Sequence, residues 1–243
     1  MRSYPSDQNE RQTDHDEVGR KNNGDLGLRL QSVSVRHRAY GWKTGWPGLV
    51  NTLALTDSEM DMVKSLRCTA YQETKIVPPP EVLSDEFDKA PNTRVFLLCE
   101  NRVAVGTIRV SSRNAPHDPP TPFSGRFASE IARQVGERSY IEITRLAVCH
   151  CKPVPAFRYA LALMQNGTAE ADRIACKYVL APIRDEHLGF YSGMGFQIIS
   201  EPRLFPGWPA SVTLACLDWS VERSRLRSHR HYGRLFSVRN EEA

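Results

Sequence analysis

Two charged residues lie inside an otherwise apolar stretch of the 243-residue chain. Residues 140–148, YIEITRLAV, are typical of a buried strand, yet they include Glu142 and Arg145. A buried charge is costly unless it is paired or used in chemistry. Glu142 is therefore either paired with a neighbouring Lys or Arg, or it works as an acid or base in catalysis.

The spacing of Glu142 and Arg145 limits how the two can act together. Residues three apart in a regular strand point to opposite faces, so these two share a face only if a bulge lies between them. Without a bulge, Arg145 would brace a loop on the other face. Because an arginine fork suits a carboxylate, we expect Arg145 to pair with Asp85 or Asp88. These two acids lie on a loop, and they either bind a substrate ammonium, fix the loop to arginines, or are solvated with Asp88 as a cap.

The elements that position these residues follow from hydrophobic periodicity and turn signals. Thr56 and Glu59 have the spacing of a capping box at a helix start, and four prolines mark 113–124 as a loop. The predicted strands are 49–55, 94–100, 103–111, 139–148, 177–183, 195–200 and 211–217, and the predicted helices are 56–72, 127–135, 155–173 and 185–193. This order indicates an α/β (α+β) domain with a mixed central sheet.

The two ends of the chain differ from its middle. We predict a disordered N-terminal tail (1–26), an arm or linker (27–48), a folded domain (49–219) and a basic C-terminal tail (220–243). Between Arg223 and Arg239 there are six arginines, two histidines and no acid. Such a run is usually solvated, or it docks an acidic partner such as nucleic acid, a membrane surface or an acidic protein.

The composition is that of a globular protein and points to no membrane or metal function. No apolar run approaches the ~20 residues that cross a bilayer, and the N-terminal residues lack the apolar region of a secretory signal. We therefore expect a cytoplasmic protein without a transmembrane segment. The six cysteines are expected to be reduced core thiols. Cys149, His150 and Cys151 lack the second ligand pair that zinc sites use, so no metal is expected.

Several motifs resemble those of known acyltransferases. Residues 190–196, FYSGMGF, look like the F-Y-x-x-x-G-F segment of the GNAT acyltransferase fold, where Gly makes the turn after a short helix. A second set resembles the acyl-homoserine lactone (autoinducer) synthases and, more closely, the related N-acyl amino acid synthases. This set comprises Arg67 with Tyr71, Asp85-x-Phe87-Asp88, Arg109 and the run Glu142-Ile143-Thr144-Arg145. The resemblance covers about residues 50–218 and implies an N-acyltransferase whose mixed central sheet has splayed strands flanked by helices.

Two departures from the related families bear on the substrates. The homoserine lactone synthases usually have a Trp shortly after the first Arg and aromatic, whereas Val77 lies in that region here, which argues against S-adenosylmethionine as the amine donor. In place of the Gly-rich pyrophosphate loop of CoA-using GNAT enzymes stand residues 149–156, CHCKPVPA. A turn with Lys152 and two prolines does not offer the same row of N–H groups.

The resemblance therefore favours a phosphopantetheine thioester on acyl carrier protein over acyl-CoA as co-substrate, with no tightly bound cofactor. The basic stretch 223–239 would steer an acidic carrier protein to the enzyme.

The reaction that the resemblance implies is attack of an amine on an acyl thioester. Glu142 would accept the proton of the amine, directly or through water. A backbone N–H near Ala147 or Val148, where the strand splays from its neighbour at a GNAT-type bulge, would polarise the thioester carbonyl. Tyr191 either protonates the departing thiolate or packs the short helix on the sheet.

The remaining polar residues are expected to bind the acceptor or to brace the site. Arg109 is the best candidate for the carboxylate of an amino acid acceptor, or else a brace, and Arg67 would hold a carboxylate or the loop. The acyl chain needs an apolar tunnel. Residues that would line it, or else belong to the ordinary core, are Phe87, Phe96, Phe123, Phe127, Phe157 and Met164.

Other functions remain open from the sequence. The chain would be an acyl-homoserine lactone synthase if it used S-adenosylmethionine, or a CoA-dependent N-acetyltransferase if it bound the nucleotide. A third alternative is a non-catalytic GNAT-like module that binds nucleic acid or membrane through its basic tail. Few aromatic residues and no reader motif occur in that tail, which disfavours nucleic acid.

Overall fold

The computed structural model describes residues 41–44, 46–74, 83–149, 156–205, 208 and 210–236 of the chain. Its strands are β1 (Gly41–Lys43), β2 (Leu49–Leu53), β3 (Thr93–Glu100), β4 (Val103–Arg113), β5 (Tyr140–Val148), β6 (Tyr178–Ile183), β7 (Gln197–Ile198) and β8 (Thr213–Asp218). Its helices are α1 (Asp57–Glu73), η1 (Glu86–Lys89), α3 (Ala128–Gln134), α4 (Ala156–Arg173), η2 (Asp185–His187), α5 (Leu188–Gly193), α6 (Trp219–Ser228) and η3 (Tyr232–Phe236). The predicted tail 1–26 lies outside the described residues.

The strands form one mixed sheet, as predicted. Their order is β1-β2-β3-β4-β5-β6-β8-β7. β5 and β6 run parallel, and the other neighbouring pairs are antiparallel. The edge strand β1 falls within 27–48, where the sequence predicted an arm or linker, and it places Gly41 opposite Thr52 of β2.

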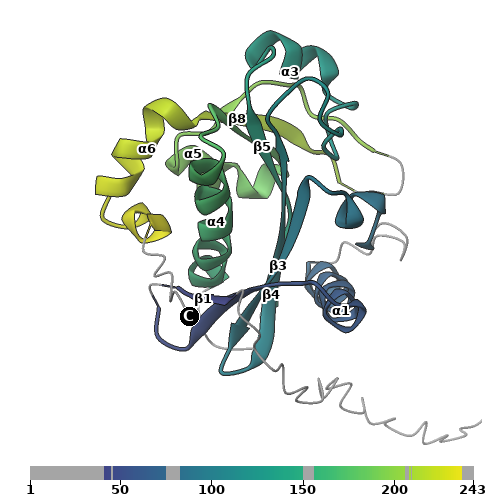
Figure 1. The fold of residues 1–243 in the computed structure, drawn as a ribbon, viewed down its shortest axis with the longest axis vertical. Helices are drawn as coiled ribbons and strands as arrows, with labels where there is room; N and C mark the ends of the chain where they lie inside the picture. The colour runs from purple at the N-terminus through teal and green to yellow at the C-terminus, as the bar shows by residue number, and fades with distance from the viewer. Residues whose placement is uncertain are drawn as a thin grey trace, which may run out of the picture. The chain divides into compact units, whose positions relative to one another are not determined.

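Helices cover both faces of the sheet, and Figure 1 shows α4 and α1 on opposite sides of it. The apolar stripe of α4 packs against β4 and β5. Gly167 permits this close approach, because a Cβ at that position would lie 2.6 Å from the Cδ1 atom of Ile143. On the other face, α1 begins at the predicted capping box: the Glu59 N–H donates to Thr56 Oγ1 at 3.2 Å, and the Thr56 N–H donates to Glu59 Oε2 at 2.8 Å.

Residues 219–236, which hold most of the basic stretch, are a folded element of the domain and differ in this from the predicted solvated tail. They form α6 and η3, whose residues Leu226 and Leu235 are buried in the same cluster as the apolar side of α4. Asp218 caps α6 by accepting from the Val221 N–H at 3.3 Å. The sequence did not predict this helix, because its arginines are separated by too few apolar residues to show a helical apolar stripe.

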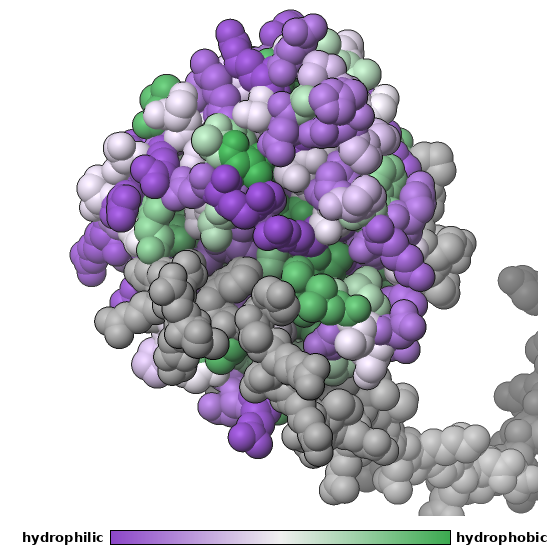
Figure 2. Space-filling view, viewed as in Figure 1, coloured by the Kyte–Doolittle hydropathy of each residue, from purple (hydrophilic) through white to green (hydrophobic). Residues whose placement is uncertain are grey.

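The face of the domain in Figure 2 is mainly polar. Figure 2 shows a largely hydrophilic face with small hydrophobic areas near its middle. Among the described residues, no helix has the length and apolar character needed to cross a membrane.

We expect Leu226→Ala to lower the free energy of unfolding by about 2–5 kcal/mol, the usual cost of removing a buried leucine side chain. The matched control is Val221→Ala in the same helix, where the side chain is 66% exposed and the change should stay within about 0.5 kcal/mol. Urea unfolding followed by circular dichroism measures both. Equal, small effects would show that α6 does not contribute to the stability of the domain.

Candidate functional site

A bulge in β5 lies at Arg145 and Leu146. Arg109 of β4 is opposite Thr144, whereas Thr107 is opposite Ala147, so two residues of β5 face the single residue between them on β4. Arg145 has a φ of 55°, which few residues other than glycine adopt. The register shift turns the Arg145 side chain toward Asp85, on the face of the sheet that carries Glu142, Thr144 and Arg109.

Beyond Glu142, β5 and β6 separate. Their parallel pairing runs only from Tyr140 opposite Tyr178 to Glu142 opposite Leu180. The Cys149 N–H donates to Val105 of β4 at 3.0 Å. Because successive N–H groups of a strand point to opposite sides, the Val148 N–H points away from β4 and toward the gap. A backbone donor directed into such a gap is suited to polarising a bound carbonyl.

A cavity of about 390 Å³ occupies this gap. Its wall is mostly apolar and aromatic, with contributions from α1, β5, α4, the end of β6 and α5. Phe123 and Phe157 of the predicted tunnel residues line it. The other four belong elsewhere: Phe96 and Phe127 are core residues, Met164 of α4 packs in the core, and the Phe87 ring lies against the Arg109 guanidinium.

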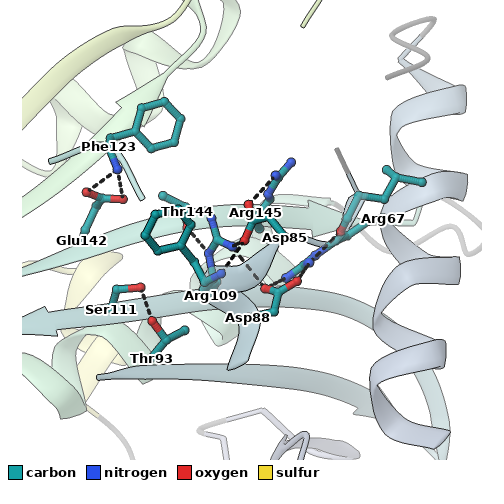
Figure 3. A network of polar contacts seen from close by, with 12 residues as sticks. Arg67, Asp85, Asp88, Thr93, Arg109, Ser111, Phe123, Glu142, Thr144 and Arg145 are labelled. Carbon is teal, nitrogen blue, oxygen red and sulfur yellow. Dashed lines mark hydrogen bonds and ion pairs between the residues drawn. The ribbon is translucent and has the colours of Figure 1, made fainter. Parts of the chain in front are cut away.

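A buried network of arginines and aspartates lies on the α1 face beside the cavity (Figure 3). Arg67 of α1 binds Asp88 with two hydrogen bonds, NH1 to Oδ2 at 2.6 Å and NH2 to Oδ1 at 3.1 Å. Arg109 donates from NH1 to Asp85 at 2.5 Å and to Asp88 at 3.2 Å, and from Nε to Thr144 at 2.9 Å. Arg145 donates from NH2 to Asp85 at 3.0 Å, which confirms the predicted pairing.

The network fixes the loop that precedes β3. Arg67 also donates to the Leu83 carbonyl at 2.7 Å, and Asp85 caps η1 by accepting from the Phe87 N–H at 3.1 Å. Burial raises the pKa of Asp88, but the hydrogen bond and charge of Arg67 outweigh it, so the pKa stays below its ordinary value. The neighbouring arginines lower the pKa of Asp85 against the same effect of burial. Both carboxylates are therefore ionised and serve to hold the loop.

This placement bears on the role that the sequence suggested for Arg109. Its side chain is 1% exposed and is engaged by Asp85, Asp88 and Thr144. Arg67 is similarly enclosed. Both arginines therefore brace the loop, whereas Arg145 is the arginine of the network that lines the cavity.

Glu142 is fully buried one layer behind the cavity wall. Its Oε2 accepts from Thr121 Oγ1 at 2.8 Å, and both of its oxygens lie 3.2 Å from the Phe123 nitrogen. Burial raises the pKa of Glu142 to about 7, against the lowering effects of the Thr121 hydrogen bond and the Arg109 charge. A carboxylate with a pKa near neutrality is poised to exchange a proton at physiological pH.

Tyr191 also lines the cavity, from α5. Its ring packs edge-on against Phe190 and Phe196, with centroid distances of 5.1 and 5.2 Å. Burial raises the pKa of its phenol above the ordinary value, so the hydroxyl keeps its proton. The turn after α5 is made at Gly195, whose φ is 98°, as the F-Y-x-x-x-G-F motif predicted.

Sequence reasoning missed Thr121 and Trp208, and it missed that the backbone N–H of Phe123 binds Glu142. Thr121 and Phe123 hold Glu142, yet the proline-rich segment around them carried no signal beyond a loop. The Trp208 ring lies over Arg145, 5.0 Å from its CZ atom, and meets Tyr71 edge-on at 5.4 Å. No periodicity links Trp208 to these partners, because it lies in an irregular segment after β7.

Two segments that bear on the choice of substrates lie outside the described residues. Val77 lies within 75–82, and the segment that replaces the pyrophosphate loop lies largely within 150–155. Cys149 is described, and it is buried in the cluster between α1 and the sheet.

We expect Asp88→Ala to lower the free energy of unfolding by about 3–5 kcal/mol, because it leaves the buried Arg67 charge uncompensated. The control is Asp61→Ala, which removes an exposed partner of Lys64 in α1 and should cost roughly 0–1 kcal/mol. Chemical denaturation of both variants measures the difference. Equal costs would mean that the network contributes little to stability.

Comparisons with known proteins agree with the family that the sequence motifs resemble. A family model described as N-acyl amino acid synthase FeeM matches residues 62–218, more than half of the chain. The solved structure of FeeM, an N-acyl amino acid synthase from uncultured soil microbes, superposes with a TM-score of 0.62 and 21% identity, over 72% of this chain and 93% of that chain. A search of curated proteins found no match.

More distant structures share the fold. The AHL synthase LasI has a TM-score of 0.50 and 15% identity, over 69% of this chain and 89% of its own. Escherichia coli ElaA has a TM-score of 0.50 and 15% identity, over 70% of this chain and 99% of its own. The fold is the GNAT acyltransferase fold, as the motifs predicted.

Proposed function

The chain belongs to the N-acyl amino acid synthase FeeM family and is an N-acyltransferase, and we propose that it joins a fatty acyl group to the α-amine of an amino acid. The observation that carries the proposal is the placement of Glu142, buried with a pKa of about 7 next to a largely apolar cavity where β5 and β6 separate. A base, a backbone donor and an apolar chamber are the parts that acyl transfer from a thioester to an amine requires.

In this proposal the acyl chain occupies the aromatic cavity and the thioester carbonyl accepts from the Val148 N–H. The amino acid enters as an ammonium, and Glu142 removes its proton through one water molecule, because the carboxylate lies behind Phe123 and Thr144. The neutral amine attacks the carbonyl carbon, a C–N bond forms, and the C–S bond breaks. Tyr191, which is protonated before the reaction, would supply a proton to the departing thiolate, and the second proton that the nitrogen loses as the amide forms would restore the phenol.

We propose acyl carrier protein as the donor, on the sequence of the segment after β5 and the basic character of α6. Some of that charge is already paired within the domain: Arg223 binds Asp172 at 2.7 Å, and Arg225 binds Glu222. An acidic carrier would be attracted by what remains, and the attraction should weaken as salt is added.

The test is transfer by purified protein from C8–C16 acyl thioesters, on carrier protein or on CoA, to a pool of amino acids, with products read by mass spectrometry. We expect N-acyl amino acids, faster from the carrier protein at low salt, and a loss of roughly 10²–10⁴ in rate for Glu142→Gln. Homoserine lactone products from S-adenosylmethionine would replace the proposal with the lactone synthase alternative. Full activity of Glu142→Gln would show that Glu142 is structural.

The pH dependence gives a separate test of Glu142. Because the base must be ionised, kcat/KM should fall as pH drops through about 7, the pKa of Glu142. The Thr121 hydrogen bond lowers that pKa, so Thr121→Val should move this limb to higher pH. The control is Thr93→Val, which removes a 2.7 Å hydrogen bond to Ser111 on the neighbouring strands without touching Glu142. If the acidic limb of the kcat/KM profile stays at the same pH in Thr121→Val, the group that titrates there is not Glu142.

A further inference from the structure

Counted over the described residues, the arginine–aspartate network carries one positive charge in excess. It contains three guanidinium groups, on Arg67, Arg109 and Arg145, and two carboxylates, on Asp85 and Asp88. An uncompensated charge away from water is costly, so such a network is complete only when a further anion joins it. Ionised Glu142 lies within reach of the Arg109 charge, but it loses its own charge whenever it takes up a proton.

The excess charge is available at Arg145. This side chain is 9% exposed and lines the cavity, whereas Arg67 and Arg109 are enclosed by their partners. Among the described residues, no group accepts a hydrogen bond from Arg145 NH1. A buried N–H without an acceptor is costly, which indicates that a ligand atom supplies one.

Two contacts hold the Arg145 guanidinium in place. Asp85 accepts from NH2, and the Trp208 ring covers the group from the cavity side of the network. An aromatic face attracts the cation but does not accept from NH1 as an oxygen would. NH1 is closed off from water, so a ligand oxygen would reach it only after a rotation of the guanidinium or of the ring.

We infer that Arg145 binds the carboxylate of the acceptor amino acid, and that this contact selects amines that carry a carboxylate; the inference rests on the proposed function. A carboxylate supplies both the missing acceptor and the missing charge, whereas a neutral amide oxygen supplies only the first. In an α-amino acid the amine is bonded to the carbon that bears the carboxylate. Holding the carboxylate at Arg145 therefore holds the amine beside Thr144, on the Glu142 side of β5.

Arg184 provides a matched comparison in the same cavity. It also lines the wall and has an NH1 atom without an acceptor among the described residues. Its charge is balanced, because its NH2 forms an ion pair with Glu186 Oε1 at 2.7 Å. Both arginines have an NH1 atom without an acceptor, but only Arg145 belongs to a group of charges with a positive excess. We therefore assign the carboxylate to Arg145.

The experiment compares kcat/KM for L-amino acids with kcat/KM for the matching amino acid amides, in the wild type, Arg145→Gln, Arg145→Lys and Arg184→Gln. We expect the wild type to prefer the acid roughly ten- to hundredfold, the range for a hydrogen bond to a charged group. Arg145→Gln should bring the ratio close to one by slowing the acid alone. Arg145→Lys should keep part of the preference, and Arg184→Gln should keep it in full.

A second readout does not need turnover. Calorimetry of the wild type should give tighter binding of an N-dodecanoyl amino acid than of its amide, and Arg145→Gln should remove that difference. Thermal melting of each variant checks that it is folded.

If kcat/KM falls equally for the acid and the amide in folded Arg145→Gln, Arg145 only braces the loop. If Arg184→Gln loses the preference for the acid, Arg184 rather than Arg145 binds the carboxylate. A wild type that transfers to acid and amide alike would overturn the inference but keep the proposed function. Absence of transfer to any amine, with no binding of either N-dodecanoyl compound, would overturn both.

Discussion

The pairing of buried arginines with Asp85 and Asp88 is the interaction on which the site depends. It joins α1, the loop at η1, and strands β4 and β5, which are distant in sequence. Burying this many charges is favourable only because nearly every one has a close partner of opposite sign. The network therefore ties the position of the loop to the position of the bulge, and a change in either would leave a charge unpaired.

The bulge at Arg145 and the separation of β5 from β6 are two consequences of one irregularity. A regular strand would send the Arg145 side chain to the α4 face, away from Asp85. The same irregular strand carries the Val148 N–H at the open gap, beyond the last residues that pair β5 with β6. In the proposed reaction this N–H is the donor to the thioester carbonyl.

Most of the fold could be predicted from the sequence, because the elements carry strong local signals. Helix α1 began at its capping box, and β5 and α4 were found within one residue of their bounds. The sequence predicted which residues form the site, but it did not predict the role of each one. Whether Arg109 or Arg145 faces the cavity depends on the register shift at residue 145, which leaves no trace in composition or periodicity. Thr121 and Trp208 lie on irregular segments, and their contacts are set by tertiary packing alone.

The charges around the cavity stay balanced through the proposed reaction. Before proton transfer, ionised Glu142 offsets the single excess charge of the network, and the amino acid enters as a zwitterion. When Glu142 takes the proton of the ammonium, it becomes neutral and the amino acid becomes an anion whose carboxylate rests on Arg145. The negative charge that disappears at Glu142 is thus replaced by the substrate on the same face of the sheet. In a cavity of low dielectric this exchange avoids separating charge, so it lowers the cost of producing a neutral amine. A pKa of about 7 at Glu142 is consistent with this arrangement, because the base must be ionised before the substrate arrives and must still bind its proton.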